Sequence, residues 1–349
     1  MTALLRRPAA AWIHIRAWLW PVLALVGLGW ALTHTSFDRA QMLQVLGHVN
    51  LAGYGSALLV FYLASILRAC RWRMLLRNAG QRTALTTDWR AIMMGWLING
   101  LIPAKTGDLY RAHAIERAYP ITLARTLGTI ALERLVDFAV LVLLIDGFAL
   151  AFFRGNLPTA FLGVFLVMGV LGLAVIIALV AAPHLRWNVA SRFPWLAGGP
   201  LGRFQEGFVQ APGNLPLLFA ITAGLWLFES ARLYLVLHAL PLQALSLTQV
   251  SLVALVGSAL TAVPGLPGGV ALVEGGIIGV LIYFGLSAAA ALSVALLDRA
   301  INYWSVLLLG AVILVAGRLF GRAALPRARV DSLVPAPVRM PVRRSRSAA

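Results

Sequence analysis

Long apolar segments separated by short polar ones make up most of this chain, and their lengths predict its helices. Six segments have the length of membrane spans: residues 17–36, 51–67 with a basic continuation to 77, 122–153, 159–182, 215–240 and 287–319. A transmembrane helix needs about 20 mostly apolar residues. The pattern therefore predicts an all-α polytopic membrane protein with about six to eight transmembrane helices.

Two further apolar segments do not have the pattern of a simple crossing. Residues 91–102 form a short run that stops at Pro103, and an amphipathic piece follows at 105–119. A run of about twelve residues is too short to cross a bilayer. Residues 248–285 are apolar but are split by the sequence VPGLPGG at 263–269. We expect both to be broken, re-entrant segments that return to their own side, with two full crossings as the alternative for 248–285.

The basic residues predict the orientation in the membrane. The chain is 60% hydrophobic and only 12% charged, with a formal net charge of +17, and 28 of its 29 basic residues are arginines. If both broken segments return, the inner segments hold 24 of these residues and the outer ones only Arg39 and Arg154. Basic residues concentrate in cytoplasmic loops. We therefore expect a bacterial inner-membrane protein with both termini in the cytoplasm, rather than a nucleic-acid-binding protein.

The two ends of the chain differ from its middle. Arg6 and Arg7 precede the first apolar run as in a signal peptide, but no small-residue cleavage site follows, which favours a retained span. From residue 326 the chain is rich in Arg and Pro and lacks apolar periodicity. We expect a transmembrane domain at 1–325 and a disordered cytoplasmic tail at 326–349.

An internal repeat relates residues 51–153 to residues 215–319. Arg68 matches Arg232, Pro103 matches Pro264, and the sequence LERLVD at 132–137 matches LDRAIN at 297–302. Three crossings separate the starts of the two units, so the repeat is expected to be inverted. Inverted repeats with broken helices are typical of transporters. Chance similarity between apolar segments is the alternative.

Ionisable groups within the predicted spans mark candidate functional positions, because they are costly in a bilayer. Glu133 and Asp137 share a helix face, and Arg134 lies three residues before Asp137, within pairing distance. Asp298, Arg299 and Asn302 copy this layout in the second unit, Glu229 and Arg232 form a further candidate pair, and Glu274 follows the break at Gly268–Gly269. The structural alternative is a set of buried ion pairs that hold helices together. Arginine forks suit phosphate, which favours a functional role for Arg134 and Arg299.

The sequence NGLIPAKTGDLYR at 99–111 predicts an anion site. It ends a half-helix with Pro and Gly, and it opens an amphipathic helix that carries Lys105, Asp108 and Arg111. A helix N-terminus with nearby cations binds anions, and a position at the cytoplasmic surface suits a lipid phosphate. The alternative is an interfacial helix whose cations snorkel to water.

Other chemistry has little support in the sequence. Cys70 is the one cysteine, the six histidines are scattered, and no GxxxxGK[ST] loop is present. We expect no metal, no cofactor and no enzymatic activity.

The charged and glycine positions together resemble a known family. The chain resembles the flippase-like transmembrane region of lysylphosphatidylglycerol synthase, the multiple peptide resistance factor, over about residues 15–320. The resemblance rests on Asn99, Pro103, Gly107, Asp108, Arg111, Glu133, Arg134, Asp137, Pro267, Gly268, Gly269, Glu274, Arg299 and Trp304. No synthase domain is expected after residue 320, so the resemblance implies a stand-alone translocating part and does not imply a lysyl-lipid substrate. Related stand-alone members look like handlers of hopanoid and polyprenyl-linked lipids.

These observations predict a lipid translocase for an anionic phospholipid or another lipid phosphate. The expected headgroup ligands are Arg134, Arg299 and Arg232, with Arg68, Lys105 and Arg111 at the cytoplasmic mouth. The expected gating and charge-partner residues are Asn99, Pro103, Gly107, Asp108, Glu133, Asp137, Glu229, Pro264, Pro267, Gly268, Gly269, Glu274, Asp298 and Asn302. The alternatives are a membrane enzyme or accessory subunit of lipid or glycolipid biosynthesis, and a pure scaffold. Membrane lipids are the expected partners, and a second copy or a biosynthetic enzyme stays open.

Overall fold

The chain folds into helices that leave large apolar surfaces on the outside. The computed structural model describes residues 38–102, 105–153, 159–181, 199–262 and 267–319, and these ranges contain helices but no strand. Within them, five segments are long and apolar enough to cross a membrane: α3 (Leu51–Asn78), α6 (Leu123–Phe153), Leu162–Ala181 of α7 (Thr159–Ala181), α11 (Leu215–His238) and Ala288–Gly317. The prediction of an all-α polytopic membrane protein is confirmed. The predicted first span and the tail lie outside the described residues.

The first broken segment is an antiparallel helical hairpin formed by α4 (Leu85–Leu101) and α5 (Thr106–Ala118). At its tip the Gly107 N–H donates to Asn99 Oδ1 over 2.8 Å, and at its base the Ala84 N–H donates to the Tyr119 hydroxyl over 2.8 Å. A Cβ at Gly107 would collide with the Gly95 carbonyl, so glycine permits this close packing. The chain therefore returns to the end from which it came. The predicted start at residue 91 was wrong, because residues 85–90, although more polar, already form the beginning of α4.

The second broken segment forms the equivalent hairpin. It consists of α12 (Leu247–Ala262), a short turn η1 (Pro267–Gly269) and α13 (Leu272–Tyr283). Gly257 faces Ile277 and Gly276 faces Leu260, which fixes an antiparallel arrangement. This segment also returns to its own end of the molecule. Its helices have 16 and 12 residues, fewer than the roughly 20 that a crossing needs, which favours the re-entrant interpretation over two full crossings. Pro103 and Pro264, which the repeat matched, lie outside the described residues.

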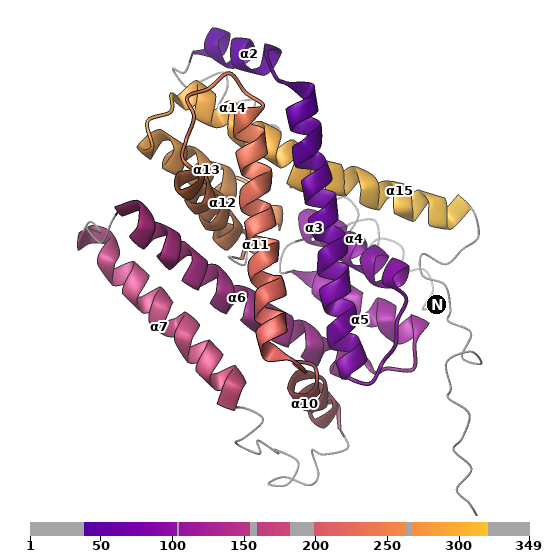
Figure 1. The fold of residues 1–349 in the computed structure, drawn as a ribbon. Coiled ribbons are helices and arrows are strands. Elements are labelled where there is room, and N and C mark those ends of the chain that lie inside the picture. Colours follow the sequence, from indigo (N-terminus) through magenta and orange to yellow (C-terminus); the bar gives the residue numbers. More distant parts are fainter. Residues whose placement is uncertain (1–37, 103–104, 154–158, 182–198, 263–266, 320–349) are drawn as a thin grey trace, which may run out of the picture.

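The first helices of the two units run antiparallel, so the repeat is inverted. The Asn50 N–H at the start of α3 donates to the Ala239 carbonyl at the end of α11 over 2.7 Å. At the opposite ends, Asn78 Nδ2 donates to the Ala211 carbonyl over 2.9 Å. Each hairpin follows the end of its own first helix, so the two hairpins enter from opposite ends of the molecule (Figure 1). Their tips meet in the middle, where η1 contacts α4.

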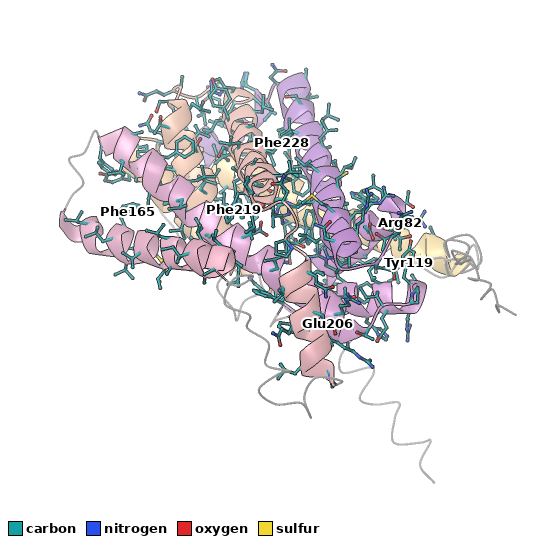
Figure 2. The ribbon with its side chains drawn as sticks, turned by 60° about the horizontal axis from the view of Figure 1, so that its bottom comes forward. Arg82, Tyr119, Phe165, Glu206, Phe219 and Phe228 are labelled. Carbon is teal, nitrogen blue, oxygen red and sulfur yellow. The ribbon has the colours of Figure 1, made fainter. Side chains whose placement is uncertain are left out.

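Three helical elements were not predicted: α2 (Arg39–Gly47), α10 (Pro200–Gln210) and the π-helical turn η2 (Ala300–Trp304) within the last span. Helix α2 precedes α3. Helix α10 lies in the predicted polar loop and crosses the start of α6 through Gly128 and Gly207. Figure 2 shows Glu206 of α10 at the end of the molecule that also holds Arg82 and Tyr119. The last span is α14 (Ala288–Arg299), a π-helical turn η2 (Ala300–Trp304) and α15 (Ser305–Leu319). Such π-turns inside helices are frequent at functional sites.

A charged cavity between the two repeat units

A cavity of about 320 Å³ lies between the two units, where the hairpin tips meet. Its volume is in the range of ligand sites. Both units contribute to its polar lining, which consists of Arg68, Asn99, Lys105, Arg134, Asp137, Glu229, Arg232, Ser258, Thr261, Asp298, Arg299, Asn302 and Tyr303. Aromatic and aliphatic side chains, among them Phe61, Trp96 and Trp226, complete the wall. The cavity therefore combines apolar walls with charges from both halves of the chain.

In the first unit, Arg134 on α6 pairs with the hairpin. Its Nη2 lies 2.7 Å from Asp108 Oδ1, and its Nε donates to Asp108 Oδ2 over 3.0 Å. The predicted partner Asp137 is 4.0 Å away, at the limit of an ion pair. The predicted pair of Arg134 with Asp137 is therefore present at its longest distance, and the fold adds a shorter one, because it brings Asp108 from the first turn of α5 against the arginine fork. The side chain of Arg134 nevertheless remains 42% exposed.

The second unit repeats this arrangement. Arg299 Nε lies 2.8 Å from Glu274 Oε1, close enough for an ion pair, although the N–H does not point at the oxygen. Glu274 stands in the first turn of α13, as Asp108 does in α5. Here the arginine side chain is only 7% exposed. The two units thus share one contact, between a mid-helix arginine and the first carboxylate after the hairpin tip, but they differ in exposure.

The acidic residue before each of these arginines is held by an arginine from another helix. Glu133 accepts from Arg71 Nη2 over 3.1 Å and from Arg111 Nη2 over 3.0 Å. Asp298 pairs with Arg232 of α11 and accepts from Asn302 Nδ2 over 2.7 Å. Both acids are buried, so their charges persist only because the arginines compensate them.

Glu229 joins the two units across the cavity. Its Oε1 lies 3.0 Å from Arg68 of α3, and its Oε2 lies 3.1 Å from Arg232 on its own helix. The predicted Glu229–Arg232 pair is therefore present. The Arg68 guanidinium also stacks 5.4 Å from the Trp226 ring centre. Arg68 therefore connects the first helices of both units.

Lys105 occupies the tip of the first hairpin in a strained conformation. Its φ of 51° and ψ of 36° are in the left-handed region, which favours glycine, and it caps α5. Among the described residues no carboxylate lies within ion-pair distance of its ammonium group. The tip therefore presents a cation that lacks a fixed counter-charge.

Comparison with known proteins identifies the family. The family model of the lysylphosphatidylglycerol synthase transmembrane region matches residues 11–310. The chain belongs to this family. It is also similar to a UPF0104 membrane protein of Methanocaldococcus jannaschii, with 28% identity over 62% of this chain and 92% of that protein. A UPF0104 membrane protein of Methanothermobacter thermautotrophicus is 34% identical over 31% of this chain and 32% of its own length. The glycosyltransferase AglD of Haloferax volcanii is 29% identical over 33% of this chain and 18% of that protein.

The family resemblance seen in the sequence is thereby confirmed, and most of the predicted ligand positions converge. Five of the six predicted headgroup ligands line the cavity, together with Asn99, Asp137, Glu229, Gly268, Asp298 and Asn302. Gly107, Asp108, Glu133 and Glu274 stand directly behind this lining as packing or charge partners. Pro267 begins η1, and the Gly269 carbonyl accepts from Arg299.

Arg111, which was predicted at the cytoplasmic mouth, is the exception, because its side chain is buried and does not line the cavity. Its side chain is 2% exposed, its guanidinium lies 4.2 Å from the Trp72 ring centre, and it pairs with Glu133. The hairpin places this arginine on the face of α5 that packs against α3 and α6, where it is fixed rather than available to a ligand.

Arg71 is the main residue that the sequence interpretation missed. It was counted among the basic residues of an inner loop, yet it is 1% exposed, and its Nη1 and Nη2 donate to Asp137 over 2.5 and 3.1 Å. It also donates to Thr222 of α11 over 2.8 Å. One signal was available, because Arg71 lies three residues after Arg68 and so shares its helix face.

The charges around the cavity do not balance. The network contains the cations Arg68, Arg71, Lys105, Arg111, Arg134, Arg232 and Arg299, and the acids Asp108, Glu133, Asp137, Glu229, Glu274 and Asp298. Seven cations against six acids leave a surplus of one positive charge among the described residues. The cation without a carboxylate partner, Lys105, is exposed, so an anion can reach it. The cavity of this family member is therefore suited to one additional anionic group.

Proposed function

We propose that the protein is a translocase for lipids with an anionic, phosphate-containing headgroup, in a bacterial inner membrane with both termini in the cytoplasm. The observation that carries the proposal is the cavity with one surplus positive charge, placed where two oppositely directed hairpins meet. Broken helices at this depth are tolerated in a membrane where they line a polar cavity. Inverted units around a central site are found in many transporters that work by alternating access.

The phosphate ligands that we propose are Lys105, Arg134 and Arg299. Lys105 is free of a carboxylate partner among the described residues, and the other two are the equivalent arginines of the two units. Each arginine fork can bind two phosphate oxygens at once. A bound phosphate would compete with Asp108 for Arg134 and with Glu274 for Arg299. Binding would thus loosen the contact between each hairpin and the helix that follows it.

The difference in exposure between the two arginines supports a gating role for the hairpins. Arg134 is 42% exposed, whereas its counterpart Arg299 is 7% exposed. In this conformation the site is accessible beside the first hairpin and closed beside the second. In the opposite conformation the site would be closed beside the first hairpin and accessible beside the second. A change between the two conformations would carry the headgroup across while the acyl chains remain in the bilayer.

Reconstitution into liposomes with a fluorescent phosphatidylglycerol tests the proposal. We expect Arg134→Gln and Arg299→Gln each to slow the flipping rate at least tenfold, about 1.4 kcal/mol in the barrier. Arg90→Gln is the matched control, because Arg90 is an exposed arginine of α4 that does not line the cavity, and it should flip at the wild-type rate. Flipping at the wild-type rate in both cavity variants would reject the assignment.

The same liposomes test the headgroup class. The surplus positive charge predicts faster flipping of the anionic probe than of a fluorescent phosphatidylcholine, whose quaternary ammonium would meet the cavity cations. Lys105→Gln removes the surplus charge and should reduce this preference. Equal rates for both lipids in the wild type would argue against anion recognition.

A second candidate is an accessory role in lipid or glycolipid biosynthesis, which the similarity to the glycosyltransferase AglD favours. In that case the cavity would present a lipid phosphate to a partner enzyme, and this chain would catalyse no bond-making step itself. Lipid binding by the purified protein without any flipping would support this candidate over the translocase.

A further inference from the structure

Asp146 is a carboxylate on the apolar half of α6, away from the charged network around the cavity. It is the one ionisable residue in the segment FAVLVLLIDGFALAFF at 138–153. Its carboxylate faces Gly169 of α7, where a Cβ would come within 2.6 Å of Oδ2, so glycine leaves room for the acid. Helix α7 packs along α6 at the edge of the molecule (Figure 1), and Phe165 of α7 lies at that edge in Figure 2.

The contact with Gly169 shows how far Asp146 lies from the two ends of α7. Gly169 is ten residues after the start of α7 and twelve before its end. At 1.5 Å per residue the contact lies about 15 Å and about 18 Å from the two ends of α7. Since Leu162–Ala181 contains no charged residue and is among the segments apolar enough to cross a membrane, Asp146 lies close to the middle of a span.

No cation compensates this carboxylate among the described residues. Its Oδ1 is buried without a hydrogen-bond partner, and no Arg, Lys or His nitrogen lies within 4 Å. Helices α7 and α12, which pack against α6, carry no charged residue. The nearest charged residue on α6 itself is Asp137, nine residues earlier, which is bound to Arg71.

Most other charged residues on helices that pack against α6 have partners elsewhere. Most of those on α3, α5 and α11 belong to the cavity network. Glu116 of α5 and Glu206 of α10 contact the start of α6, at Leu123 and Arg125, and Glu274 of α13 pairs with Arg299. An ionised carboxylate without a partner is expensive at the centre of a bilayer, whereas a protonated one is much less so.

We propose that Asp146 is a proton-binding site that is occupied at neutral pH and exchanges its proton during the transport cycle. Asp146 differs in this respect from the network acids. Each of those has an arginine that stabilises its ionised form, so none is suited to hold a proton. The transport part of this inference rests on the proposed translocase function, whereas the proton site rests only on geometry.

Hydrophobic carbodiimides detect such a site directly. The proton of a carboxylic acid moves to one nitrogen of dicyclohexylcarbodiimide, and the carboxylate oxygen bonds to the central carbon. The resulting O-acylisourea rearranges to a stable N-acylurea, so the residue gains the mass of one whole carbodiimide. An ionised carboxylate lacks the proton that starts this addition.

Labelling of the full-length protein in liposomes at pH 7, followed by peptide mass spectrometry, tests the proton site. We expect modification of the peptide that contains Asp146 by dicyclohexylcarbodiimide but not by a water-soluble carbodiimide. Asp146→Asn should reduce the labelling of that peptide at least tenfold, whereas Asp137→Asn should leave the labelling of Asp146 in place. An unlabelled Asp146 peptide in the wild type, or labelling of the same peptide that persists in Asp146→Asn, would overturn the proposal.

Flipping with and without a pH gradient tests the transport part. In the wild type we expect a gradient to change the flipping rate of fluorescent phosphatidylglycerol, and in Asp146→Asn we expect the ratio of the two rates to fall to about one. Asparagine has the shape and neutrality of the protonated acid, so an unchanged melting temperature would show that the variant folds. An equal gradient response in both proteins would overturn the coupling. If the wild type does not flip lipid at all, the translocase proposal fails while the labelling result still stands on its own.

Discussion

Arg71 connects more charged groups of the network than the sequence pattern indicated. It holds Glu133 and Asp137 of α6 while it donates to Thr222 of α11, and it is fully enclosed. Arg71→Gln would leave two buried carboxylates without this cation. We expect a loss of about 3–5 kcal/mol in stability, as for other broken buried pairs. Thermal unfolding in detergent measures it, with the exposed Arg90→Gln as the matched control. A melting temperature equal to that of the wild type would mean that Arg71 does not contribute this stability.

Asp88, in the first turn of α4, predicts a pH-dependent stability. It is fully buried, it accepts from the Thr83 hydroxyl over 2.6 Å, and its Oδ1 has no partner among the described residues. Burial raises its pKa from 3.8 to about 7. Between these two values the folded state keeps a proton that the unfolded state has released, so stability falls as the pH rises from about 4 to about 7.

The variant Asp88→Asn isolates this contribution. A shift of about three units corresponds to about 4 kcal/mol, which is fully present below pH 4 and lost above pH 7. Asparagine resembles the protonated acid, so Asp88→Asn should melt higher than the wild type at pH 8 and show a smaller difference between pH 5 and pH 8. The same pH response in both proteins would assign the effect to other groups.

At the scale of single residues, contacts within one helix were predictable and contacts between helices were not. The Glu229–Arg232 pair follows from a spacing of three residues, and the structure contains it. The pairing of Arg134 with Asp108 depends on how α5 packs against α6, which spacing along the chain does not encode. Arg111 was misplaced for the same reason, because its burial is decided by the contact with Trp72 and Glu133.

At the scale of elements, the close packing of the first hairpin depends on Gly107. A side chain there would meet the Gly95 carbonyl and the Asn99 side chain, and both are fixed parts of α4. Gly107→Ala should therefore push α5 away from α4 and cost about 1–3 kcal/mol. Gly275→Ala is the control, because a Cβ added to this glycine of α13 would have no neighbouring atom within 4 Å.

Alanine is the better helix former, so the control variant should be neutral or slightly more stable. Thermal unfolding in detergent compares the two variants with the wild type. Equal melting temperatures for Gly107→Ala and Gly275→Ala would contradict the tight packing of α4 against α5.

Element lengths were largely readable from the sequence because apolar runs end where polar or helix-breaking residues begin. Helices α3, α6, α7 and α11 begin and end within about two residues of the predicted bounds, as is usual for helix ends. The π-turn η2 was not predictable, because residues 300–304 continue the apolar pattern of a regular span. Helix α10 was missed since its apolar residues were too few to stand out within a polar loop.

At the scale of the whole molecule, the match of Arg68 with Arg232 and of 132–137 with 297–302 anticipated an inverted pair of units. The meeting of the hairpin tips was not anticipated. It depends on side-chain contacts between the units, such as the Tyr303 hydroxyl that donates to the Gly100 carbonyl over 3.0 Å. The cavity arises from this meeting, which explains how residues far apart in the sequence come to share one site.

The opposite entry of the two hairpins makes a topology prediction that a membrane can test. Arg82 lies in the loop before the first hairpin, and Gln243 lies in the equivalent loop before the second; both side chains are exposed. After Cys70, which is exposed, has been replaced by alanine, Arg82→Cys and Gln243→Cys provide one thiol each. Because α3 and α11 are antiparallel, these thiols should react with an impermeant maleimide from opposite sides of the membrane. We expect Arg82→Cys to react from the cytoplasmic side, because basic residues are concentrated at 68–90. Reaction of both thiols from the same side would contradict the inverted arrangement on which the proposed translocase function rests.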